Sequence, residues 1–264
     1  MGVVERHAVR ETGRADGQPI LFAHGFGCDQ NMWRFVTPTF EPHYRVIVFD
    51  YVGAGNSDLA SYDSQRYSSL SGYADDVIEI CRELDLHDVI FVGHSVGAMI
   101  GAIVAIERPH LFAKLVMVGP SPRYIDADDY AGGFTESDIE ELLASLESNY
   151  LGWSSAMGPA IMGNPDRPGL GVELVESFCR TDPEIARQFA RVTFMSDNRS
   201  DLAKVDVPTL VLQCRDDIIA PIRVGEYVQR ALPDGEMVVL DATGHCPHLS
   251  EPEQTAAAIA AFLR

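Results

Sequence analysis

The chain has 264 residues, of which 46% are hydrophobic, and this predicts one large domain with an extensive buried core. Its 39 acidic and 20 basic residues give a formal net charge of −19, and the basic residues form no block. Nucleic acids and anionic membranes require basic surfaces, so neither is expected as a partner. The charge favours a small neutral molecule as the ligand.

The first ten residues, MGVVERHAVR, are charged and lack the apolar segment of a secretory signal. No stretch approaches the ~18 apolar residues of a membrane-spanning helix. We therefore expect a cytoplasmic protein. The five cysteines are odd in number, widely scattered and form no C-x-x-C pair, so they predict neither a disulfide framework nor a metal site.

Six short apolar segments predict strands, at 19–24, 44–50, 88–93, 113–119, 207–213 and 236–241. Helical patterns lie between and after them, at 71–86, 97–108, 223–232 and 252–264. Continuous apolar strands are typical of a parallel sheet that is buried on both faces. Their alternation with helices predicts a doubly wound α/β sheet.

The alternation stops between about Pro120 and Leu202, where only helical segments are found. We interpret this stretch as a helical lid inserted into a single domain whose core comprises residues 1–119 and 203–264. An ordinary extra helical layer is the alternative. Large apolar residues of the insertion either pack among themselves or line an apolar pocket, and Trp153, Met157 and Phe194 are our candidates for contact with a substrate.

A strand, a tight turn and a helix surround the sequence Gly93-His94-Ser95-Val96-Gly97. In this context the G-x-S-x-G pattern predicts a nucleophile elbow, in which the serine side chain projects from the carboxyl end of a strand. A helix N-cap is the alternative role for Ser95. No glycine-rich nucleotide site is predicted at Gly53-x-Gly55, because Asp58 stands where the third glycine is required.

A nucleophilic serine needs a base and an acid that orients it, in the chain order Ser, Asp, His. Asp216 and Asp217 follow one predicted strand, and His245 follows the last. The spacing to Pro221 favours Asp217 as the acid, with Asp216 as the alternative. His248 is expected to support the neighbouring loop.

An oxyanion hole is predicted from two backbone N–H groups. The glycine-rich stretch His24-Gly25-Phe26-Gly27 supplies Phe26, and Val96 follows the nucleophile. His24 is expected to stabilise its loop. No cofactor or metal is implied.

With these motifs, the chain resembles the α/β-hydrolase superfamily and, within it, the RsbQ-like regulators of the bacterial general stress response, which are related to the strigolactone and karrikin receptors. The resemblance rests on stretches such as HGFGCDQNMW, FDYVGAGNSD, FVGHSVGAMIG, FCRTDPEIARQFA and GHCPHLSEP. It implies a triad of Ser95, Asp217 and His245, and a cap of four helices inserted after the sixth strand. It also implies a small apolar pocket to which Phe26 contributes, and a PAS-domain phosphatase as a possible signalling partner.

Overall fold

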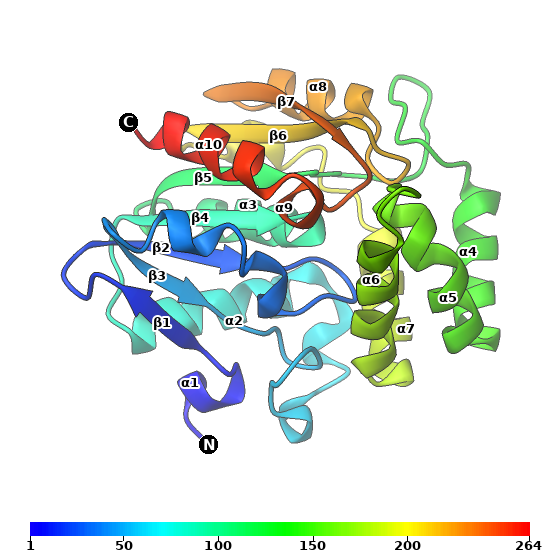
Figure 1. The fold of residues 1–264 in the computed structure, drawn as a ribbon, viewed down its shortest axis with the longest axis horizontal. Helices are drawn as coiled ribbons and strands as arrows, with labels where there is room; N and C mark the ends of the chain where they lie inside the picture. Colours follow the sequence, from blue (N-terminus) through cyan, green and yellow to red (C-terminus); the bar gives the residue numbers. More distant parts are fainter.

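The computed structural model describes all 264 residues, which form a seven-stranded sheet with helices on both faces and a group of helices at one end (Figure 1). The strand order is β1-β3-β2-β4-β5-β6-β7. All neighbouring strands are parallel except β1 and β3, which are antiparallel. This is the predicted mostly parallel, doubly wound architecture.

Six of the seven strands correspond to predicted ones: β2 (Gln18–Ala23), β3 (Tyr44–Val48), β4 (Val89–His94), β5 (Phe112–Val118), β6 (Thr209–Asp216) and β7 (Gly235–Thr243). The first strand, β1 (Arg10–Gly13), was not predicted. All four of its residues are exposed, so it has no apolar pattern that the sequence could reveal.

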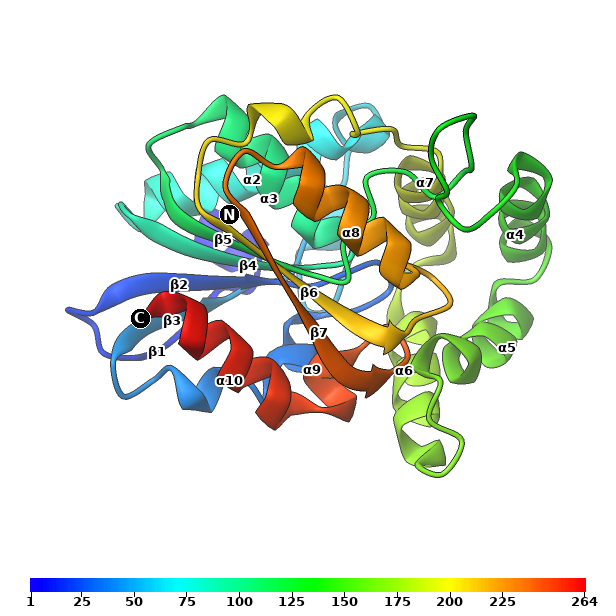
Figure 2. The ribbon, with the colours of Figure 1, turned by 90° about the horizontal axis from the view of Figure 1, so that it is seen from above.

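Two helical layers cover the sheet (Figure 2). The helices α2 (Leu70–Glu83), α3 (Val96–Glu107) and α8 (Ile222–Ala231) lie on one face, and α9 (Pro247–Ser250) and α10 (Pro252–Leu263) lie on the other. A short helix, α1 (Val3–Arg6), precedes β1. No helix is both long and apolar enough to span a membrane.

Side chains of β2 alternate between the two sides of the sheet, as the pleat of a strand requires. Leu21 and Ala23 belong to the core beneath α2 and α3, whereas Ile20 and Phe22 belong to the core beneath α10. Burial on both faces explains why the central strands are continuous apolar segments.

Four helices lie between β5 and β6: α4 (Glu136–Ser148), α5 (Tyr150–Met162), α6 (Pro168–Arg180) and α7 (Pro183–Phe194). They stand at the carboxyl ends of the strands (Figure 1). The insertion follows the fifth strand of the chain, β5. The expected position after the sixth strand is therefore wrong. Asn149 separates α4 from α5, and its side chain caps α5 by accepting the N–H of Gly152.

Candidate active site

Ser95 occupies the turn between β4 and α3 with φ +55° and ψ −123°, a conformation that few residues other than glycine adopt. The flanking glycines are required by close backbone contacts. A Cβ atom on Gly97 would lie 2.6 Å from the carbonyl oxygen of His24, and one on Gly93 would lie 2.6 Å from the nitrogen of Ala98. The Ser95 side chain does not cap α3. The strained turn instead places its hydroxyl at the carboxyl edge of the sheet.

Three side chains from separate loops form a hydrogen-bonded chain at this edge. The Oγ atom of Ser95 lies 2.8 Å from Nε2 of His245, and Nδ1 of His245 lies 2.7 Å from Oδ2 of Asp217. The other oxygen of Asp217, Oδ1, accepts the backbone N–H groups of Ile219 and Ala220. These bonds hold the carboxylate in place, so it can orient the imidazole. All three side chains are buried.

Asp216, the alternative acid, lies outside this chain of hydrogen bonds. Its side chain is exposed, and its backbone carbonyl accepts the N–H of Gly244 at 2.7 Å. Asp216 therefore helps to position the loop that carries His245, while its carboxylate faces solvent.

The backbone N–H groups of Phe26 and Val96 have no partner within the secondary structure. The N–H of Phe26 donates to no backbone acceptor. Val96 is the first residue of α3, where an N–H has no partner within the helix. These are the two donors that the sequence predicts.

The loop that carries Phe26 is fixed by two buried polar residues. Nε2 of His24 accepts the N–H of Tyr51 at 3.2 Å, which gives His24 the expected loop-stabilising position. The buried carboxylate of Asp50 accepts the N–H groups of Gln30 and Asn56, both at 2.8 Å. The Gly53-x-Gly55 segment is thereby attached to the Phe26 loop and braces the edge of the sheet.

A small apolar cavity with a free volume of about 30 Å³ opens onto Ser95. Its wall comes from the sheet edge, the His245 loop and the insertion, and consists of Phe26, Cys28, His94, Ser95, Tyr124, Ile161, Leu174, Phe178, Thr193, Phe194, Ile219, His245 and Cys246. A space of this size holds about one or two water molecules. Side chains of the insertion must therefore move before an organic ligand can enter.

Only some of the predicted pocket residues line the cavity. Phe26 and Phe194 line the cavity, but Trp153 and Met157 do not. Trp153 packs behind the wall, with its ring centroid 6.1 Å from that of Phe26 and 5.4 Å from that of Phe178. Met157 is partly buried against the same apolar cluster. Helical spacing identifies buried residues, but it does not separate the wall of a cavity from the layer behind it.

Tyr124 is a wall residue that the sequence did not single out. It is buried, and burial raises the pKa of its phenol, while a hydrogen bond with Ser95 has the opposite, smaller effect on this pKa. The phenol is thus neutral, and it lines the cavity beside Ser95. It lies in the segment between β5 and α4, where no motif marks it.

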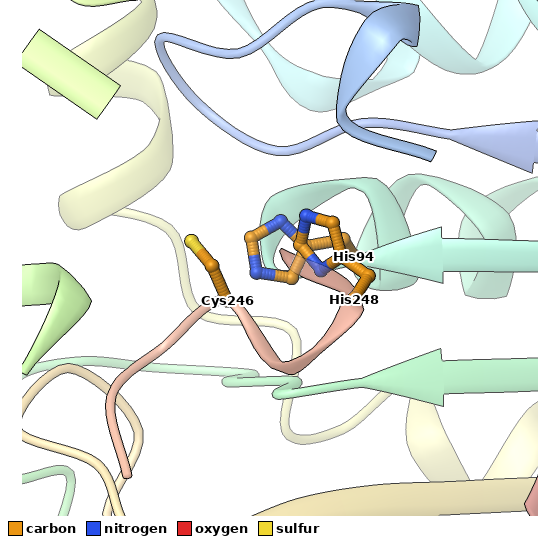
Figure 3. A group of neighbouring side chains, drawn as sticks. All are labelled: His94, Cys246 and His248. Carbon is orange, nitrogen blue, oxygen red and sulfur yellow. The ribbon is translucent and has the colours of Figure 1, made fainter. Parts of the chain in front are cut away.

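Three buried residues, His94, Cys246 and His248, lie next to one another behind Ser95 (Figure 3). The sequence, with its scattered cysteines, does not predict this proximity. Burial lowers the pKa of His248 to about 3 and that of His94 well below its usual value. Both imidazoles are therefore neutral at physiological pH. Burial also raises the pKa of the Cys246 thiol well above its usual range.

The model of the alpha/beta hydrolase family matches residues 20–258, a range that contains all three residues of the hydrogen-bonded chain. The chain belongs to this family. It is 40% identical over 259 residues to the karrikin insensitive 2 receptor CA of Petunia hybrida, a match that covers 96% of this chain and 94% of the receptor.

Two further proteins are similar to this chain over nearly their whole length. The strigolactone esterase D14 of Arabidopsis thaliana is 39% identical over 263 residues, which cover 99% of this chain and 96% of the esterase. The solved structure of a hydrolase from Oleispira antarctica is 42% identical, covers 99% of this chain and 96% of that one, and superimposes with a TM-score of 0.96.

Proposed function

We propose that the protein is a serine hydrolase that cleaves a small, neutral, apolar ester or lactone. The observation that supports this most strongly is the hydrogen-bonded chain from Ser95 through His245 to Asp217. A buried serine in a strained turn, with an imidazole on its Oγ atom, has the arrangement of an activated nucleophile.

In this mechanism Ser95 Oγ attacks the carbonyl carbon while Nε2 of His245 takes its proton. Asp217 holds the N–H tautomer at Nδ1 and stabilises the imidazolium that forms. The N–H groups of Phe26 and Val96 stabilise the oxyanion. His245 then protonates the leaving alkoxide, and water, activated by the same imidazole, hydrolyses the acyl-serine. Each step uses residues of this chain alone.

The cavity wall supports the proposed substrate class. Nine of its 13 residues are hydrophobic, and no lysine or arginine is among them. A charged carboxylate or phosphate would lose its hydration without gaining a cationic partner. The larger hollow of about 820 Å³ on the surface, between the start of α2 and the helices α4 and α7, contains no member of the hydrogen-bonded chain and is not the proposed site.

We further propose that the site serves signalling, as in the RsbQ-like regulators, with a PAS-domain phosphatase as the partner that responds to the ligand or product. An alternative is a ligand sensor with little or no turnover. The relative from Petunia hybrida is named as a receptor and the one from Arabidopsis thaliana as an esterase, so both roles occur among proteins at about 40% identity.

Turnover and occupancy can be separated with a single variant. Ser95→Ala removes the nucleophile but leaves the cavity wall almost unchanged, so it should bind a small aryl ester without cleaving it. The test combines ester turnover with thermal-shift titration by the same ester. Binding with full loss of turnover supports the hydrolase, whereas equal turnover by the wild-type protein and Ser95→Ala would contradict it.

A further inference from the structure

The buried group formed by His94, Cys246 and His248 has the composition of a metal site (Figure 3). One nitrogen of each imidazole and the sulfur atom of the cysteine lie within 4.8 Å of one another. On a zinc ion with bond lengths of ~2.0–2.3 Å, tetrahedral donors stand roughly 3.3–3.6 Å apart. The three donors therefore need to approach one another by no more than about 1.5 Å.

The imidazole of His248 has none of the hydrogen bonds that a buried imidazole normally forms. Its side chain is 0% exposed, and neither Nδ1 nor Nε2 has a hydrogen-bond partner. A buried polar group without a partner is costly and calls for an explanation. Its ring packs against the indole of Trp33, with the centroids 4.7 Å apart, so the ring plane is fixed.

His94 is arranged as a metal-binding histidine usually is. Its Nε2–H donates to the carbonyl oxygen of His245 at 2.8 Å, which leaves the lone pair on Nδ1, and Nδ1 has no partner. Metal-bound histidines commonly donate their second N–H to a backbone carbonyl in this way. Gly25 packs closely against this ring, because a Cβ at position 25 would lie 2.7 Å from Nδ1.

We propose that these three residues bind one borderline or soft cation of the Zn²⁺ type, and that its binding reversibly inhibits the hydrolase. Two imidazoles and a thiolate are the donors that such cations prefer. The Cys246 thiol gives its proton to solvent as the sulfur–metal bond forms. His94 and Cys246 line the Ser95 cavity, so the ion enters through the cavity and a water completes its coordination there.

The inhibition follows from the place of His245 between the ligands. Its carbonyl oxygen accepts the His94 N–H, and Cys246 is the next residue in the chain. Movement of both ligands toward an ion therefore displaces the backbone of His245 and disturbs its 2.8 Å contact with Ser95. The inhibitory part of this inference rests on the proposed function, whereas metal binding does not.

The experiment uses Co²⁺ and Zn²⁺ with the purified full-length protein. Co²⁺ bound to a thiolate gives charge-transfer absorption, which reports the site without any catalytic readout. We expect one Co²⁺ per chain, displaced by Zn²⁺, and a parallel loss of ester turnover that a chelator reverses. Absence of this absorption in the wild-type protein at saturating Co²⁺ would overturn the proposal.

Three variants locate the site. Cys246→Ala and His248→Phe should each weaken Zn²⁺ binding by more than ~10-fold, since even the loss of an outer partner of a metal ligand costs 10–100-fold. His248→Phe retains an aromatic ring against Trp33, so it remains informative if Cys246→Ala fails to fold. Cys179→Ala, which removes the exposed thiol, is the matched control and should bind as the wild-type protein does.

The outcomes separate the two proposals. Metal binding that depends on Cys246, in a protein without ester turnover, would support the metal site and count against the hydrolase. Metal binding lost in Cys179→Ala, or retained in both Cys246→Ala and His248→Phe, would overturn the site. Zinc inhibition that persists in Cys246→Ala would overturn the inhibitory role.

Discussion

Asp217 and His245 stand 28 residues apart in the chain, yet Oδ2 of Asp217 lies 2.7 Å from Nδ1 of His245. The contact arises because β6 and β7 are parallel neighbours, so the loops at their carboxyl ends meet. The adjacent Asp216 remains exposed. The two aspartates therefore provide a matched pair for testing the role of the acid.

Asp217→Asn should lower kcat for a small aryl ester by up to ~10⁴, because an amide does not hold the required tautomer of His245. Asp216→Asn should leave kcat almost unchanged, because its exposed carboxylate lies outside the hydrogen-bonded chain. Steady-state kinetics of the two variants provides the measurement. A larger loss in Asp216→Asn would show that the acid is assigned to the wrong residue.

The cavity wall predicts a change of substrate preference in Phe178→Ala. This buried ring lines the cavity, and its removal creates space at a cost of about 3–5 kcal/mol in the free energy of unfolding. The ratio of kcat/KM for a butyryl ester to that for an acetyl ester should rise. Trp153→Phe is the control, because Trp153 lies behind the wall, and it should leave the ratio unchanged. A shift of the ratio in the control alone would contradict the described wall.

The buried pair of His7 and Asp76 predicts how stability depends on pH. The Nε2 atom of His7 lies 3.8 Å from Oδ1 of Asp76. Burial lowers the pKa of His7 to about 4 and raises that of Asp76 to about 6. The contribution of His7 to the free energy of unfolding therefore decreases as the pH falls from 6.5 toward 4, because His7 binds a proton first in the unfolded chain. Protonation of Asp76 has the opposite effect: it stabilises the folded protein as the pH falls from 6 to 3.8, because the folded chain binds this proton first.

Two variants separate these contributions by denaturant unfolding at pH 7 and pH 5. Acidification from pH 7 to pH 5 should lower the free energy of unfolding of His7→Gln by about 2 kcal/mol less than that of the wild-type protein. The same acidification should lower the free energy of unfolding of Asp76→Asn by more than that of the wild-type protein. Equal pH dependence in all three proteins would show that neither group titrates differently in the folded and unfolded states.

Chelation should not lower ester turnover, because no step of the proposed mechanism uses a metal. Dialysis of the protein against a chelator, followed by kinetics with and without added Mg²⁺ or Ca²⁺, tests this expectation. Activity that is lost on chelation and returns with either ion would contradict the mechanism.

Local patterns in the sequence predict six strands and the elbow at Ser95, because burial on both faces and a strained turn each require particular residue types. Strand β1 leaves no such pattern, since all residues of Arg10–Gly13 are exposed and none is apolar. The wall of the cavity depends on how α5 and α7 are rotated against Phe26, which helical spacing does not encode. The proximity of His94 to Cys246 and His248 is equally hidden, because it depends on contacts across about 150 residues of chain.

The central claim is that Ser95 is an activated nucleophile, and labelling with a serine-directed aryl phosphonate tests it most directly. Intact-protein and peptide mass spectrometry should show one adduct per chain, on Ser95, with ester turnover lost in proportion to labelling. The Ser95→Ala variant should take up no label and show no turnover. A wild-type protein that remains unlabelled while it cleaves the ester, or a Ser95→Ala variant that retains turnover, would contradict the account.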